Sequence, residues 1–344
     1  MADDLLDPAP LRNCRVKCGI LGGVSDSSSR ISAVQGQHWR QLRAQGEQVR
    51  AHLSASATLI KADALAWLHE LPPCSIHAVV TDPPYALIEY AARDHGKLRA
   101  GRGGVWRIPP MLDGVRRRPL PRFTVLSGPE LEQLTRFFSE LGTALHRVLV
   151  PGGHVFLASN PLLSTLTFHA LQQVGLEKRG EVVRLVQTLR GGDRPKGAER
   201  EFADVSVMAR AGWEPWGIFR KSPEGTVAQN LKRWGTGGLR RLGAAAPFKD
   251  VIASAPTGRA ERAIAPHPSL KPQAFLRQLV RASLPLGTGI VYDPFAGSAS
   301  TLAAAQALGY RAIGTERDAR YYRMGCRAFE KLAALRVKQA NRDP

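Results

Sequence analysis

Cysteine and long apolar runs are both scarce in this chain of 344 residues. The four cysteines, Cys14, Cys18, Cys74 and Cys326, form no CxxC pair and no Cys/His cluster with zinc spacing, so we expect no metal site. No apolar run reaches the roughly 18 residues that a membrane span requires. The opening residues MADDLLDPAP are acidic and lack the apolar core of a signal peptide. We therefore expect a reducing, cytoplasmic environment and no membrane partner.

Negative charge is also scarce. The chain has 48 Lys and Arg against 29 Asp and Glu, which gives a formal net charge of +19 at pH 7 and a pI of about 10.5. Such a balance favours a polyanionic partner, because cations placed against phosphates release condensed counterions. A basic protein without such a partner stays an alternative at this point. Hydrophobic residues make up 44% of the chain, which excludes global disorder and permits a sizeable core.

Strand-like and helix-like segments alternate from residue 58 to 190 and again from about 271. Strands are predicted at 58–61, 76–81, 154–158, 180–189, 290–292 and 311–314. Helices are predicted at 63–71, 128–149, 161–174, 271–284, 300–308 and from about 318. The helix at 128 begins with a capping box of Ser127 and Glu130. The alternation indicates an α/β fold with a doubly wound, mostly parallel sheet.

A glycine turn follows the predicted strand at 290–292. The segment 290–298, IVYDPFAGS, has the pattern of a strand, a tight turn and a helix start, and Glu316 ends the next strand nineteen residues after Gly297. A nucleoside-binding unit has this form, because the glycine lets the backbone approach the ligand and the carboxylate accepts ribose hydroxyls. The single glycine suits a cofactor without phosphates, such as S-adenosylmethionine. Taken alone, an ordinary turn with a chance acidic residue stays an alternative.

A tetrapeptide, Asp82-Pro83-Pro84-Tyr85, follows the apolar strand at 76–81. An exocyclic amine such as adenine N6 is a poor nucleophile, because its lone pair is delocalised into the ring. The Asp82 carboxylate and the Pro83 carbonyl are two acceptors that would bind its two N–H bonds and free that lone pair. Tyr85 would stack on a base that has left its helix. A Pro-Pro turn with a packed tyrosine is the structural alternative.

Three ordered segments together resemble the amino-methylating DNA methyltransferases of the β-type order, in which the catalytic motif precedes the cofactor motif. They are Lys61–Leu65 with Thr81 and DPPY, Arg147–Gly153, and His267–Pro272 followed by DPFAGS. The resemblance covers about residues 58–190 and 264–335. It implies a Rossmann-like fold that binds S-adenosylmethionine.

The resemblance also implies roles for individual residues. Asp82, Pro83, Pro84 and Tyr85 are expected to be catalytic. The residues expected to hold the cofactor are Asp63 (at the adenine ring), Lys271, Asp293, Phe295, Gly297, Ser298 and Glu316. One departure is Gly297-Ser298-Ala299-Ser300, where the family usually has Gly-Ser-Gly-Thr. Because alanine replaces glycine without strain only at negative φ, we expect a helix N-terminus at Ala299.

Four regions follow from these assignments. We expect a flexible or weakly helical extension over 1–55, a catalytic half over 56–190, a target-recognition insertion over 191–265, and a cofactor-binding half over 266–344. Segment 93–122 has nine basic residues against two acidic ones, and segment 220–249 has seven against one. The predicted DNA contacts are Arg116, Arg117, Arg118, Lys232, Arg233, Trp234, Arg240 and Arg241. Residues 191–196 would line the base pocket or hinge the insertion, and solvated surface loops stay an alternative for both basic segments.

The sequence therefore predicts a site-specific enzyme that transfers a methyl group from S-adenosylmethionine to adenine N6 in duplex DNA after base flipping. Asp at the first motif position favours adenine, since cytosine-N4 members of the family more often have Ser there. A cytosine-N4 enzyme, an RNA methyltransferase, a non-catalytic DNA-binding module and a nicotinamide oxidoreductase are the alternatives. Double-stranded DNA is the expected partner, which implies association with the nucleoid. A homodimer and a cognate restriction nuclease are left open.

Overall fold

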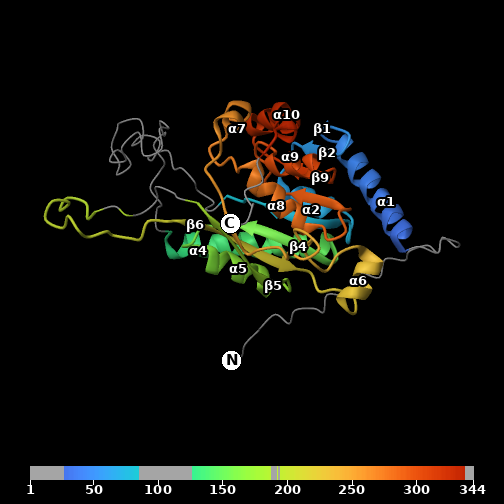
Figure 1. Cartoon of the computed structure of the whole chain (residues 1–344), viewed down its shortest axis with the longest axis horizontal. Coiled ribbons are helices and arrows are strands. Elements are labelled where there is room, and N and C mark those ends of the chain that lie inside the picture. The colour runs from blue at the N-terminus through green and yellow to red at the C-terminus, as the bar shows by residue number, and fades with distance from the viewer. Residues whose placement is uncertain (1–26, 85–125, 187–191, 193, 338–344) are drawn as a thin grey trace, which may run out of the picture.

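A nine-stranded sheet forms the centre of the protein in the computed structural model, which describes residues 27–84, 126–186, 192 and 194–337 (Figure 1). The strand order is β1-β2-β9-β8-β3-β4-β6-β5-β7. The strands are β1 (Ala51–Leu53), β2 (Ala57–Ile60), β3 (Ile76–Thr81), β4 (Leu149–Ala158), β5 (Glu177–Leu185), β6 (Trp213–Arg220), β7 (Val251–Ala253), β8 (Ile290–Asp293) and β9 (Arg311–Thr315). The run from β2 to β4 is parallel, which confirms the predicted mostly parallel α/β sheet.

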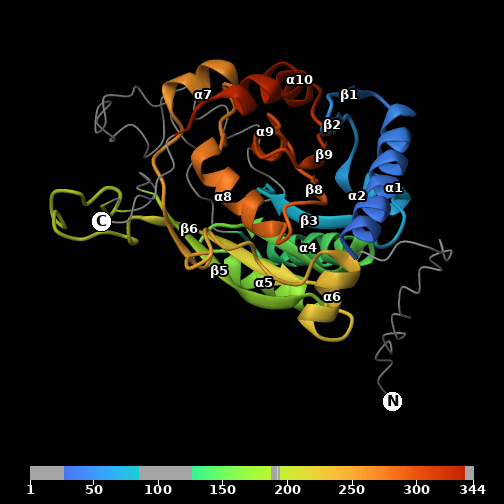
Figure 2. The same ribbon diagram turned by 45° about the vertical axis from the view of Figure 1, so that its right-hand side comes forward.

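Helices cover both faces of this sheet (Figure 2). Helices α8 (Gln273–Ser283), α9 (Ser300–Ala307) and α10 (Ala319–Ala334) pack in one apolar cluster, and α2 (Ala64–Glu70), α4 (Gly128–Val148) and α5 (Ser164–Gln173) pack in the other. All six residues of β3 are buried, and alternate ones belong to opposite clusters. This burial on both faces explains why the strand is mostly apolar, with Ala78, Val79 and Val80 in succession.

The predicted start of α4 is confirmed. The backbone N–H of Ser127 donates to the Glu130 carboxylate at 2.7 Å, as a capping box requires. Among the described helices, none has the length and apolarity that crossing a bilayer demands.

The extension over 1–55 was expected to be flexible or weakly helical. Over residues 27–55, the part that the structure describes, it is helical but packs on the domain as an ordered part of the fold. Helix α1 (Ser27–Glu47) packs its buried Ile31, Trp39 and Leu42 inward, and β1 pairs antiparallel with β2 at the edge of the sheet (Figure 2). Most residues of the helix are polar, so the sequence pattern did not indicate which few of them would pack against the sheet. Residues 1–26 lie outside the described residues.

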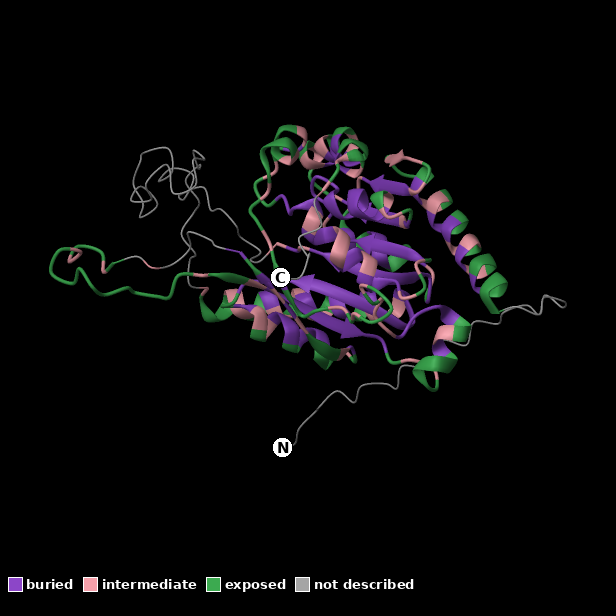
Figure 3. Cartoon of the chain, in the orientation of Figure 1, coloured by how far each residue is buried: buried purple, intermediate pink, exposed green. Residues whose placement is uncertain are grey.

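The predicted insertion over 191–265 also needs correction. Strand β6 lies inside the sheet between β4 and β5, and its Trp216 is fully buried. Helices α6 (Val227–Trp234) and α7 (Arg259–Ile264) and strand β7 then follow in the same segment. What leaves the sheet is the connection from β5 to β6. Its described residues, 192 and 194–212, form a long, mostly exposed arm (Figures 1 and 3), which we call the β5–β6 arm.

We expect the Leu42→Ala variant to lose about 2–5 kcal/mol of unfolding free energy, because Leu42 is fully buried in the core cluster shared with α4. The measurement is urea unfolding followed by circular dichroism. The matched control is Gln41→Ala on the exposed face of α1, which should stay within about 0.5 kcal/mol of the wild type. Equal stability of both variants would show that α1 does not pack on the domain.

Candidate active site

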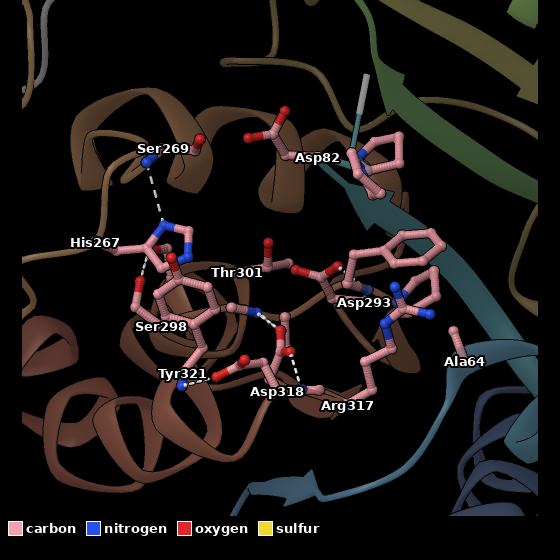
Figure 4. Close-up of a pocket in the computed structure, with 18 of the residues that line it drawn as sticks. Ala64, Asp82, His267, Ser269, Asp293, Ser298, Thr301, Arg317, Asp318 and Tyr321 are labelled. Carbon is pink, nitrogen blue, oxygen red and sulfur yellow. Dashed lines mark hydrogen bonds between the residues drawn. The ribbon is translucent and has the colours of Figure 1, made fainter. Parts of the chain in front are cut away.

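A cavity of about 400 Å³ opens at the carboxyl ends of β3 and β8 (Figure 4). Every predicted catalytic or cofactor residue that the structure describes lines it: Asp63, Asp82, Pro83, Pro84, Lys271, Asp293, Phe295, Gly297, Ser298 and Glu316. Tyr85 lies outside the described residues. The cavity forms because β3 and β8 are parallel neighbours, so the loops that follow them meet at one edge of the sheet.

Asp293 lies at the floor of this cavity and is only 3% exposed. Its Oδ1 accepts hydrogen bonds from Thr81 Oγ1 at 2.7 Å and from the backbone N–H of Phe295 at 3.1 Å. Burial raises the pKa of Asp293 to about 6, the hydrogen bonds from Thr301 and Thr81 oppose this shift, and the charge of Asp82 adds to it. The carboxylate is therefore ionised at neutral pH and becomes neutral under mildly acidic conditions.

Asp82, the first residue of the tetrapeptide, forms an ion pair with Lys271. Lys271 Nζ donates to Asp82 Oδ2 at 2.6 Å and lies 3.5 Å from Glu214 Oε2. The sequence predicted Lys271 as a cofactor residue. The structure places Lys271 in the cavity, but its ammonium pairs with Asp82, the carboxylate predicted to bind the target amine.

The turn after β8 brings Gly297 against Glu316. Gly297 has φ of +53°, and a Cβ there would lie 3.2 Å from His267 Nε2, so the position favours glycine. Glu316 accepts from the backbone N–H of Gly297 at 2.9 Å and of Asp318 at 2.6 Å. Burial raises the pKa of Glu316, and both backbone hydrogen bonds oppose that shift. The predicted glycine–carboxylate pair is thus one hydrogen-bonded unit at the cavity wall.

Ala299 does not have the negative φ that we expected. It is the N-cap of α9, as the predicted helix N-terminus requires, but its φ is +62°. Its carbonyl accepts the first hydrogen bond of the helix from Ala303, and its side chain is fully buried. Ala299 therefore has a left-handed conformation at the position where the family pattern has glycine, and its Cβ makes that conformation unfavourable by about 1–2 kcal/mol.

Asp63 lines the cavity and also caps the N-terminus of α2. Its Oδ1 caps α2 by accepting from the backbone N–H groups of Leu65 at 3.0 Å and Ala66 at 3.2 Å. Its Oδ2 lies 3.8 Å from Nη1 of the exposed Arg317.

Three aromatic side chains of the cavity had no role in the sequence-based prediction. The rings of His267 and Tyr321 pack edge to face, with their centroids 4.3 Å apart (Figure 4). The ring centroid of Phe137, on α4, lies 6.0 Å from that of Phe295. Burial, with the charges of Lys271 and Arg320, lowers the pKa of His267 to about 4, so the imidazole is neutral near pH 7. His267 stands in the HPSLKP block and was identifiable. Phe137 carried no signal, because α4 meets the cavity only in the folded protein.

The residues predicted to contact DNA fall into three groups: some are wholly or partly buried, some are exposed, and some lie outside the described residues. Trp234 is 8% exposed and its Nε1 donates to Glu224, so the structure does not support it as a base-stacking residue. Asn230 of the same helix donates to the carbonyl of Pro151 near the start of β4, whereas Leu157 pairs with Thr81 beside the cavity. These two points lie toward opposite ends of β4, so α6 is away from the cavity.

Lys232 and Arg233 are exposed on α6. Figure 1 shows this helix on the right, away from the β5–β6 arm on the left. Arg240 donates to the Tyr310 hydroxyl, and the exposed Arg241 donates to the Ala244 carbonyl. Arg116, Arg117 and Arg118 lie outside the described residues. Within the part of the chain that the structure describes, no group of three or more His, Cys, Asp or Glu is placed to hold a metal ion.

Comparison with known proteins supports the resemblance drawn from the motifs. The model of a DNA methylase family, N6_N4_Mtase, matches residues 215–327. The chain is related to the amino-methylating DNA methyltransferases. The match begins inside β6 and ends inside α10, so it includes most of β6 and of the segment that the sequence predicted as an insertion.

Two relatives and one solved structure illustrate this relation. The DNA adenine methyltransferase YhdJ of Escherichia coli K12 is 45% identical over 64 residues, which are 19% of this chain and 21% of YhdJ. The type II methyltransferase M2.DpnII of Streptococcus pneumoniae is 32% identical over 92 residues, 27% of this chain and 34% of that protein. The PvuII DNA methyltransferase, described as cytosine-N4-specific, superimposes with a TM-score of 0.51 at 15% identity, covering 83% of this chain and 89% of its own. That likeness shows a shared methyltransferase fold.

Assignment of this cavity to S-adenosylmethionine, a cation, predicts a pH-dependent affinity. Because burial raises the pKa of Asp293 to about 6, its negative charge is present above that pH and is lost below it. Cofactor affinity should therefore fall as the pH drops below about 6, by up to tenfold per pH unit. Isothermal titration calorimetry between pH 5 and 8 measures this. The Asn variant of Asp293 should bind weakly with a flatter profile, and a flat wild-type profile would contradict the prediction.

Proposed function

We propose that this protein is an S-adenosylmethionine-dependent DNA methyltransferase that methylates the exocyclic N6 of adenine in duplex DNA. The observation that carries the proposal is the shared cavity, into which the Asp82 tetrapeptide and the Gly297–Glu316 unit both open. The family match and the relative described as a DNA adenine methyltransferase support the same activity.

The cavity residues fit S-adenosylmethionine in shape and in charge. Gly297 leaves room where a Cβ would meet His267, and Glu316 offers the remaining lone pairs of its carboxylate for ribose hydroxyls. Asp293 and Asp63 supply negative charge, and Phe295 supplies an apolar wall for the adenine ring. When bound, S-adenosylmethionine supplies a methyl group on a positively charged sulfur, and it leaves as the neutral thioether after transfer.

The tetrapeptide prepares the target amine. The Asp82 carboxylate and the Pro83 carbonyl accept its two N–H bonds, so its nitrogen lone pair points toward the methyl donor. Two successive prolines hold that carbonyl rigid. The nitrogen becomes cationic as it gains the methyl group, and its surplus proton passes to Asp82 or to water. Catalysis therefore rests on positioning and fixed charge rather than on a general base that acts before attack.

Duplex DNA approaches the edge of the sheet where the cavity opens. A base must leave the stack to reach Asp82, which lies below the surface with a side chain 19% exposed. The β5–β6 arm leaves the sheet next to β4, whose Leu157 pairs with Thr81, and Figure 3 shows that it is mostly exposed. Its exposed residues include Arg194, Lys196 and Arg200. We assign phosphate contacts to this arm in preference to α6, because α6 lies away from the cavity.

Replacing Asp82 by alanine should abolish methyl transfer while cofactor affinity stays within a few-fold. The charge-assisted acceptor is lost from a dry site, which costs several kcal/mol in the transition state. The measurement is incubation of the protein with S-adenosylmethionine and unmethylated duplex DNA, followed by nucleoside mass spectrometry. N6-methyladenine is the expected product, and the exposed Asp250→Ala is the control with unchanged rate.

Each other product has a defined meaning. N4-methylcytosine would assign the same chemistry to the other base, and methylation of RNA alone would contradict the DNA assignment. More than about a tenth of the wild-type rate in the Asp82 variant would remove Asp82 from the amine site.

Neutralising Arg194 and Lys196 together should weaken DNA binding and flatten its salt dependence. Each lost phosphate contact removes about 0.9 from the log–log slope, so this double variant should lose up to about 1.8. The control neutralises Lys232 and Arg233 on α6, which are also exposed and carry the same number of positive charges; Arg233 pairs with Glu224 at 2.9 Å. DNA affinity is measured for both variants over a range of salt concentrations, with the same oligonucleotide. If only the α6 variant has a smaller log–log slope, the DNA-binding surface lies on α6 and not on the arm.

A further inference from the structure

A chain of four alternating charges runs from the active site into the sheet. Asp82 pairs with Lys271 at 2.6 Å, Lys271 lies 3.5 Å from Glu214 Oε2, and Arg184 Nη1 donates to the same oxygen at 3.4 Å. Their side chains are between 6% and 19% exposed. Asp82 and Lys271 line the cavity, whereas Glu214 and Arg184 are not among its lining residues. The second pair therefore lies behind the first.

Glu214 is held in place by groups that do not belong to the cavity. Trp216 Nε1 donates to its Oε1 at 2.7 Å, and Arg184 is itself held by Ser254 Oγ at 3.0 Å. Burial raises the pKa of Glu214, but the charges of Lys271 and Arg184 outweigh this and lower it, so the carboxylate is ionised. Glu214 is thus a fixed negative charge on strand β6.

Lys271, as the structure shows it, competes with the target amine. Its ammonium donates to Asp82 Oδ2, one of the two carboxylate oxygens that could accept from the amine. It also places a positive charge beside a nitrogen that becomes cationic during methyl transfer. Because Lys271 Nζ lies 2.6 Å from Asp82 Oδ2, an amine bound to the same carboxylate would lie close to the ammonium. In a poorly solvated site the repulsion between the two cations is costly unless another anion takes up the lysine.

We propose that Glu214 is a positioning residue that takes over the Lys271 ammonium when the target amine binds Asp82. While no base is bound, Lys271 occupies the position of the amine on Asp82 and keeps this carboxylate paired. A shift of Nζ from one carboxylate to the other needs only a rotation of the lysine side chain, because Glu214 Oε2 is already 3.5 Å away. The inference rests on the proposed function and adds a residue that the DPPY and HPSLKP motifs do not contain.

An ion pair of the same kind at the far end of the same strands provides the control. Glu177 of β5 pairs with Arg220 of β6 at 2.6 Å, near the amino end of β4 and away from the cavity. Glu177→Gln removes one carboxylate from the β5–β6 pair, as Glu214→Gln does, but leaves the charges around Asp82 intact. Any general weakening of the β5–β6 pairing should appear in both variants.

The experiment measures single-turnover methyl transfer to unmethylated duplex DNA with saturating S-adenosylmethionine. We expect Glu214→Gln to lower the rate about 10- to 100-fold, with the Kd for the cofactor within a few-fold and the Glu177→Gln rate unchanged. Glu214→Asp should recover part of the loss. In a Lys271→Met background, Glu214→Gln should have less than about a threefold further effect, since it acts through the lysine.

The outcomes separate the two proposals. If the wild type transfers no methyl group to duplex DNA, the proposed function fails and this inference fails with it. If the wild type is active but Glu214→Gln keeps its rate, only the inference is overturned. The same holds if Glu214→Gln lowers the rate equally with and without Lys271, or if Glu177→Gln lowers it as much.

Discussion

Strands β3 and β8 lie side by side and parallel, and a single hydrogen bond joins their carboxyl ends. Thr81 Oγ1 donates to Asp293 Oδ1 at 2.7 Å across 212 residues of sequence. A buried carboxylate is tolerated only when its oxygens are hydrogen-bonded, and Asp293 receives bonds from Thr81, Thr301 and the Phe295 backbone. The contact therefore stabilises the cavity floor and sets the tetrapeptide after β3 against the glycine turn after β8.

Charge is distributed unevenly over this protein, and the two signs have different partners. The chain carries a formal net charge of +19, which suits a polyanion. The acidic residues that line the cavity suit a cationic cofactor and a reaction that creates positive charge on nitrogen; they are Asp63, Asp82, Asp293, Glu316 and Asp318. Lys271 is a cation inside this acidic site, and its place between two carboxylates accounts for how it is accommodated.

Elements with strong local patterns were predictable, and elements defined by their neighbours were not. The predicted strand at 76–81 and the capped helix beginning at 128 match β3 and α4. Strand β6 was missed because Pro215 and Gly217 interrupt its pattern and are unusual inside a sheet. Its neighbours β4 and β5 accommodate both residues, and Phe168 leaves no room for a Cβ at Gly217. Helix α1 was missed because most of its residues are polar.

The sequence by itself determined the chemistry-bearing segments, because each depends on one strand and the turn that follows it, or on two strands that are consecutive in the chain. DPPY after an apolar strand, and a glycine turn with a carboxylate nineteen residues on, are local patterns of this kind. Only the tertiary structure decided that Lys271 contacts Asp82 from 189 residues away, that Glu214 stands behind it, and that Trp234 is buried rather than free to meet DNA. Such contacts depend on which strands become neighbours and in what register, which is set by packing of the whole sheet rather than by any local run of residues.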